Sequence, residues 1–361
     1  MENRSVDVTY EYNSYTLLGV LHDTGTEFTL DDDTVGEEWN AGTSSITFSF
    51  THDNFLRCYI IDRISKNILH ERCDLTLQEW INHLKRETIN PIARYPIPHR
   101  QGPTIPNHTA NYVPNEYRKL IKSMVTFLVD IHDAGYSTAG FGMPNIVIKN
   151  EVVKFWKVQF ITASMGSKNN DFICLHRVVE SLFSGEQHLH LPREMQHFLD
   201  LLISGTQSED EYLISRHVAI MSHDERVSFF TDCWERQHSL PKNQQGCYKR
   251  ATRGLGRNQN WTGRISDTSL GPLYDCYDYH TRTNGGFDDR SGNKERINRE
   301  LIKCWRHLGT HLREKGKTYG YAFNDRDIDV MVMHVFADKI AQFQKLLWTN
   351  DGILTEFRSG E

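Results

Sequence analysis

The feature that most constrains the fold is a cluster of prolines that separates two unlike parts of the chain. Six of the ten prolines lie between residues 91 and 114. Proline lacks a backbone N–H and clashes with the preceding helical turn, so this stretch cannot form a helix and is either an inserted loop or a boundary. Strand patterns dominate before it and helical patterns dominate after it. This order predicts an α+β part followed by helical domains.

The part before the prolines contains mostly strand signals. Segments rich in β-branched and aromatic residues predict strands at 6–22, 44–50 and 54–73, the last being two strands joined by a turn at Lys66 and Asn67. An acidic, glycine-containing loop is expected at 32–43. A short helix is expected at 76–87, because Thr76 followed by Glu79 forms the pattern of a capping box.

Helical periodicity starts directly after the prolines. In 115–136 the apolar residues recur at helical spacing, and Gly135 stands where a C-cap would end the helix. Two short strands are expected next, around a turn at Asn150 and Glu151. From Asp171 onward the pattern is helical, with the clearest segments at 171–183, 193–204, 223–237 and 327–348.

Charge and cysteine usage exclude several classes of protein. A net charge of −6 argues against binding nucleic acid by bulk electrostatics, although a local patch stays open. The seven cysteines contain no C-x-x-C pair, which indicates reduced thiols rather than a zinc knuckle or a redox motif. Neither an apolar leader nor a run of about 18 apolar residues is present, so we expect a cytoplasmic protein with no membrane partner.

One predicted helix, 298–312, carries an unusual polar group beside its apolar face. Arg306, His307 and His311 lie within six positions of one another. Histidine can exchange protons near neutral pH, and arginine offers a permanent charge with a planar fork of donors for phosphate. Metal-free RNA cleavage needs these groups, because a base must activate the 2′-hydroxyl, an acid must protonate the leaving oxygen, and a cation must stabilise the phosphorane. The alternative is a packed amphipathic helix with exposed histidines.

Five segments, in this order, resemble a protein kinase fold that continues into a kinase-extension nuclease (KEN) domain, the pairing found in ribonuclease L and in the unfolded-protein-response sensor kinase–endoribonuclease. They are "ILHERCDLTLQEWI", "FLVDIHDAGYSTAGFGMPNIVI", "NDFICLHRVVESLFSG", "RHVAIMSHDERVSFFTDCWERQ" and "LIKCWRHLGTHL". The resemblance spans residues from about 50 to 348. It implies a degenerate, shortened kinase-like fold over 1–215, an all-α KEN-type domain over 216–350 and a C-terminal tail over 351–361.

The kinase-like part lacks the groups that phosphoryl transfer requires. If Asn145 is the catalytic-loop asparagine of the family, the H-R-D position is the T-A-G of 138–140, and the companion lysine position is Gly142. The D-F-G position then falls on the F-I-T of 160–162. Base and metal-binding carboxylates are both absent from these positions, which predicts a pseudokinase. We expect neither nucleotide binding nor a cofactor, and the expected role of Asn145 is to cap its own loop.

The resemblance also implies roles in the nuclease part. It makes His311 the general acid and Arg306 the phosphate contact, with unwinding near Gly309 bringing them together. His307 stands where the family usually has asparagine, and it would bond a phosphate oxygen or act as the base. The family tyrosine thirteen residues before the arginine is replaced by Asn293.

Three nearby tyrosines offer a substitute for the missing one. They could serve only if the loop 280–293 is an insertion that shifts the register, and they are Tyr274, Tyr277 and Tyr279. A site in which two histidines bind a metal is not expected, because no third ligand stands at a useful spacing.

A basic segment at 241–264 is the second candidate contact with RNA. It contains six basic residues and no acidic one, and Arg257, Trp261 and Arg264 are the candidates for contacting the backbone and stacking a base. Trp261 and Arg264 are better placed than the other residues if the tryptophan anchors the segment in the core. A solvated flexible loop is the alternative reading of the same segment.

Two functions follow from the sequence. The first is a metal-independent endoribonuclease on a dead kinase scaffold, with RNA as its partner and homodimerisation implied by the resemblance. The second is a non-enzymatic scaffold that binds RNA or another partner.

Overall fold

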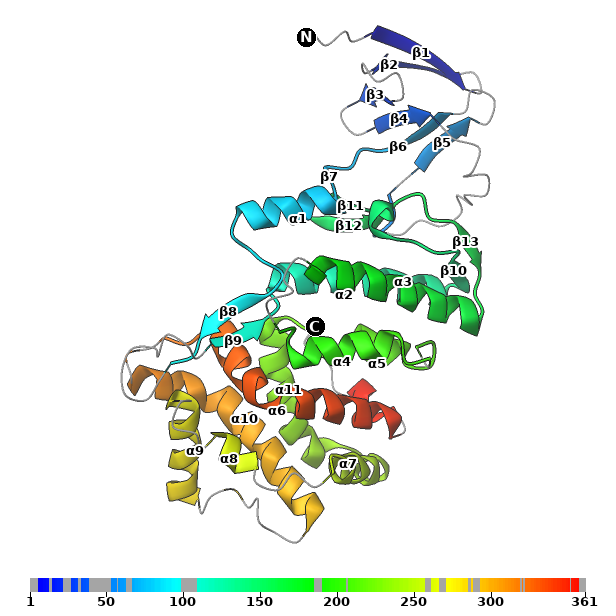
Figure 1. Cartoon of the computed structure of the whole chain (residues 1–361). Helices are drawn as coiled ribbons and strands as arrows, with labels where there is room; N and C mark the ends of the chain where they lie inside the picture. The colour runs from blue at the N-terminus through cyan, green and yellow to red at the C-terminus, as the bar shows by residue number, and fades with distance from the viewer. Residues whose placement is uncertain are drawn as a thin grey trace. The chain divides into compact units, whose positions relative to one another are not determined.

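The structure is a computed structural model, in which the chain divides into two compact units. One unit comprises Met1–Thr88 and Ser123–Leu182, and the other comprises Ile89–Lys122 and Phe183–Glu361. Figure 1 shows the elements of each. The residues that the structure describes are 6–12, 15–21, 27–31, 34–38, 53–56, 58–62, 67–98, 109–184, 190–205, 207–256, 261–265, 271–284, 287, 293–318, 320, 322–350 and 352–356.

The N-terminal strands of the first unit form one antiparallel sheet in the order β1-β2-β3-β4-β6-β5. The strand predicted at 6–22 is a pair of neighbouring strands, and β4 lies within the predicted loop 32–43, so the prediction of a loop there is wrong in part. The prediction at 44–50 lies outside the described residues. The strands are β1 (Val6–Tyr12), β2 (Tyr15–Leu21), β3 (Glu27–Asp31), β4 (Thr34–Glu38), β5 (Cys58–Asp62) and β6 (Asn67–Glu71).

Local sequence signals account for the next elements of this unit. Helix α1 (Leu77–Arg86) follows β7 (Leu75–Thr76) and starts with the predicted capping box, in which the Glu79 N–H donates to Thr76 Oγ1 at 3.3 Å. Strands β11 (Ile146–Lys149) and β12 (Val152–Phe155) pair around the predicted turn. That turn holds Asn150 at φ 49° and Glu151 at φ 62°.

The side chains of Asp171 and Asn145 make hydrogen bonds to the loop between β10 and β11. Asp171 accepts hydrogen bonds from the Thr138 N–H at 2.8 Å and from His132 Nε2 at 2.9 Å. Asn145 Oδ1 accepts from the Gly142 N–H at 3.0 Å, which confirms its expected capping role. The surrounding elements are α2 (Asn115–Asp133), β10 (Tyr136–Thr138), η2 (Met143–Asn145), β13 (Phe160–Thr162) and α3 (Met165–Phe183).

The second unit joins a two-stranded hairpin to a set of helices, so it begins earlier in the chain than the domain boundary at 215 and 216 that the sequence suggests. Packing of β9 and α4 on α11 explains the difference. Its elements are β8 (Ala93–Pro96), β9 (Thr109–Tyr112), α4 (Arg193–Leu202), α5 (Glu211–Ser215), α6 (His223–Ser239), α7 (Lys242–Gly254), α8 (Trp261–Ile265), α9 (Gly271–Asn284), α10 (Lys294–Thr318), α11 (Asp325–Thr349) and η5 (Ile353–Glu356).

The core of this unit lies where α10 packs against α6 and α11. The predicted apolar face of α10 is fully buried, with Leu301, Ile302, Trp305, Leu308 and Leu312 all at 0% exposure. The basic segment that follows α6 is helical in α7 and α8, so the alternative of a flexible loop is wrong for the described residues of 241–264.

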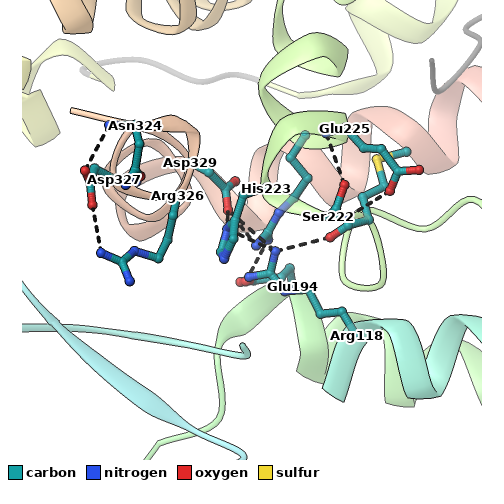
Figure 2. A network of polar contacts seen from close by, with 11 residues as sticks. Arg118, Glu194, Ser222, His223, Glu225, Asn324, Arg326, Asp327 and Asp329 are labelled. Carbon is teal, nitrogen blue, oxygen red and sulfur yellow. Dashed lines mark hydrogen bonds and ion pairs between the residues drawn. The ribbon is translucent and has the colours of Figure 1, made fainter. Parts of the chain in front are cut away.

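A buried carboxylate, Asp329, connects four elements of the second unit (Figure 2). It is fully buried on α11 and lies 2.7 Å from Arg226 Nη2 and 2.6 Å from His223 Nδ1, both on α6. Arg118 of α2 lies 3.6 Å from the same oxygen. Arg226 also donates to Glu194 of α4 at 3.1 Å. We call these five side chains the Asp329 network.

The charges of the Asp329 network depend on one another. Burial disfavours a charged Asp329, but Arg226, His223 and Arg118 together hold its pKa below the usual value. Burial and the neighbouring Arg226 lower the pKa of Arg118 to about 9. Removing the central carboxylate would therefore leave like charges facing each other in the core.

We predict that Asp329→Ala lowers the free energy of unfolding by about 3–5 kcal/mol, because it leaves buried cations without their partner. Asp338→Ala is a matched control on the same helix, since the Asp338 ion pair with Arg264 is solvent-exposed on both sides. The control is expected to cost about 0–1 kcal/mol. Urea denaturation followed by circular dichroism measures the free energy of unfolding of both variants. Equally small decreases in that free energy would show that the Asp329 network does not stabilise the unit.

Candidate functional site

Helices α9 and α10 bring three histidine side chains into contact. His307 and His311 are one turn apart on α10, and their ring centroids are 4.6 Å apart. His280 of α9 lies on the other side of His307, also with 4.6 Å between ring centroids. The Phe287 ring stacks on His280 at 4.3 Å. We call His280, His307 and His311 the histidine cluster.

The central histidine of the cluster, His307, is neutral near pH 7. Its side chain is buried, and Nε2 lies 3.2 Å from the backbone oxygen of Cys276. A carbonyl oxygen can only accept, so Nε2 carries the hydrogen and Nδ1 is unprotonated in the neutral ring. Burial, followed by the neighbouring His280 and His311, lowers the pKa of His307 to about 4.

The two outer histidines have different surroundings. His311 Nδ1 lies 3.1 Å from Glu314 Oε2, and the His311 side chain is 36% exposed. Because a carboxylate accepts, Nδ1 carries a hydrogen and Nε2 is left for proton exchange with a ligand. The hydrogen bond from His311 also lowers the pKa of Glu314. His280 is buried, and burial together with Lys303 and His311 lowers its pKa.

Arg306, in contrast, turns away from the cluster. Its Nε lies 3.8 Å from Glu235 Oε1 of α6. The expected unwinding at Gly309 is wrong, since α10 is continuous over Lys294–Thr318. Gly309 lies against α6, where an added Cβ would make an ordinary contact of 3.7 Å with the Val227 backbone oxygen. A spacing of five residues in an intact helix separates Arg306 from His311 by about 140°.

Lysines supply the positive charge beside the cluster, and the sequence did not single them out. Lys315 Nζ lies 3.6 Å from the centre of the Tyr279 ring, and Lys303 Nζ lies 5.8 Å from the centre of the Phe287 ring. Tyr279 is half-exposed. Asn293 has a structural role, because its Oδ1 accepts from the backbone N–H of Glu295 at 3.0 Å, just inside the start of α10.

The basic segment does not present the expected RNA contacts. Trp261 is 4% exposed, with its ring 5.6 Å from that of Phe287, so it anchors α8 in the core. The anchoring role considered for Trp261 is thereby confirmed, and the expectation that it stacks a base is wrong. Arg264 donates to the Val335 backbone oxygen at 3.2 Å and pairs with Asp338 at 3.4 Å. Arg257 lies outside the described residues.

Comparisons with known proteins give no relative from which to transfer a role. No protein-family model matches this chain, and no curated protein matches its sequence. Within the described ranges, no group of three or more His, Cys, Asp or Glu side chains is arranged to hold a metal ion. No helix in the described part of the chain is long and apolar enough to span a membrane.

His280 is the residue of the cluster that sequence reasoning missed. It begins the segment expected to be an insertion, yet it lies within α9. The sequence signal that could have indicated His280 is its position four residues after Cys276, which places both on one face of a helix. Both residues are buried, and both lie near His307. His280 reaches His307 only because α9 packs against α10, and the sequence does not show that packing.

The low pKa of His307 predicts a pH-dependent stability. Its folded-state pKa of about 4 lies below the ordinary 6.5, so between these values the unfolded chain binds a proton that the folded chain does not. Stability therefore rises with pH in this window and falls as pH decreases from about 6.5 to about 4. Relative to His307→Asn, wild type should lose more free energy of unfolding on acidification. Urea denaturation at several pH values measures the free energy of unfolding of both proteins. Parallel curves of that free energy against pH would show that His307 does not have a lowered pKa.

Proposed function

We propose that this chain is a metal-independent endoribonuclease of the KEN type, built on a kinase-like scaffold that does not transfer phosphate. The observation that carries the proposal is the histidine cluster. It gathers three imidazoles on two packed helices, with a neutral buried ring and a half-exposed ring side by side. Lys303 and Lys315 lie close by for a phosphate group.

Proton transfer would be shared between the outer histidines. His280 takes the proton of the RNA 2′-hydroxyl, whose oxygen attacks phosphorus, and its lowered pKa keeps it unprotonated at neutral pH. The bond from phosphorus to the 5′-oxygen breaks, and His311 donates a proton from Nε2 to that oxygen. The products are a 2′,3′-cyclic phosphate and a 5′-hydroxyl. With a pKa of about 4, His307 is a weak base and instead holds the two rings in position.

The kinase-like part fits the role of an inactive scaffold. In the loop at the expected catalytic position, Asp171 accepts from the Thr138 N–H and Asn145 accepts from the Gly142 N–H. It offers Thr138, Ala139 and Gly140 where phosphoryl transfer needs a base carboxylate. By resemblance, this part would bring two nuclease domains together in a homodimer.

Two observations favour the second candidate, a non-enzymatic scaffold that binds RNA or another partner. Arg306 pairs with Glu235 rather than facing the histidines, and Asn293 caps a helix where the family has tyrosine. A cleavage assay with labelled RNA distinguishes the two functions.

We predict that purified protein cuts a labelled, structured RNA in the presence of EDTA. His280→Ala and His311→Ala should each lower the rate by about 10²–10⁴, since each removes one proton-transfer group. His83→Ala, an exposed histidine on α1, is the matched control and should cut at the wild-type rate. Circular dichroism checks that the variants are folded.

Two results would overturn the proposal. Absence of cleavage by wild type at a concentration where a dimer is confirmed would favour the scaffold. Undiminished cleavage by the His280 and His311 variants would show that the histidine cluster is not the site.

A further inference from the structure

A cavity of about 780 Å³ lies in the second unit, away from the histidine cluster. Its walls come from the hairpin β8–β9, the segment that leads into α4, and the helices α6 and α11. No described residue of α9 or α10 lines it. Cavities of about 300–1,000 Å³ are the size that encloses a small organic ligand.

Positive charge dominates the polar lining. Arg94 and Arg193 are exposed at the cavity, and the exposed His190 and His334 also line it. Glu194 is the one acidic residue among the described lining residues, and Arg226 neutralises it at 3.1 Å. The excess of arginine favours an anion with several oxygens, because a guanidinium offers paired donors to phosphate or carboxylate.

A third arginine, Arg226, lies behind the exposed pair. Arg226 is fully buried and forms part of the cavity wall. Its Nη atoms bond Glu194 and Asp329, whereas its Nε has no hydrogen-bond partner among the described residues. The Nε itself is closed off from the cavity, so Arg226 forms part of the wall, and ligand contacts fall to the exposed Arg94 and Arg193.

The remaining wall is apolar and suits a flat group. Val330, Met333 and Ala337 lie on one face of α11, and Tyr112 of β9 adds an aromatic ring. The cavity is also larger than a bare phosphate requires. We propose that it binds a small phosphate-bearing molecule with a planar apolar group, which is the chemistry of a mononucleotide. This site is separate from the loop at 138–145, where nucleotide binding is not expected.

Isothermal titration calorimetry of the full chain tests the proposal with AMP, ATP, adenosine and inorganic phosphate as probes. AMP or ATP should bind at least tenfold more tightly than adenosine or phosphate alone. The double variant Arg94→Ala/Arg193→Ala should weaken that binding at least tenfold, since it removes two exposed cations without disturbing the Asp329 network. Arg86→Ala, an exposed arginine on α1, is the matched control and should bind as wild type does.

Three outcomes would overturn the proposal. The first is that neither nucleotide binds, and the second is that phosphate alone binds as tightly as AMP. The third is that a short RNA oligonucleotide binds more tightly than either nucleotide and loses that binding in the double variant, which would make the cavity part of an RNA surface. Thermal denaturation of each variant shows whether lost binding reflects lost folding.

Discussion

The second unit depends on one buried carboxylate. Asp329 lies in the core with cations from α2 and α6 around it, and Arg226 extends the contact to α4. Helices α6 and α11 both pack on α10, which carries two of the three clustered histidines. The placement of the candidate site therefore rests on an ion network that takes no part in its chemistry.

Burial gives similar polar residues different roles within this unit. In the Asp329 network, arginine charges are retained because a carboxylate compensates them in the core. In the histidine cluster, burial beside two other imidazoles keeps the His307 ring neutral. His311 differs again, because its ring reaches solvent and bonds Glu314. In the proposed mechanism His307 therefore positions the rings, and proton transfer falls to His280 and His311.

Local signals predicted much of the fold, and tertiary pairing decided the rest. The capping box of Thr76 and the buried face of α10 follow from spacing along the chain, and both are confirmed. Arg306 pairs with Glu235 because α10 packs on α6, and Trp261 is buried because α8 packs beside Phe287. Both outcomes depend on which elements pack together. Such pairings join residues far apart in sequence, so periodicity alone could not predict them. For the same reason the sequence indicated His307 and His311 but not His280.

We propose that imidazoles on α9 and α10 cleave RNA through its own 2′-hydroxyl. Mass spectrometry of the fragments formed in EDTA from an RNA oligonucleotide tests this most directly. The account predicts fragments ending in a 2′,3′-cyclic phosphate and a 5′-hydroxyl, and no cut where a single 2′-deoxy nucleotide replaces the cleaved position. Fragments with 5′-phosphate ends, or cleavage at the deoxy position, would contradict it.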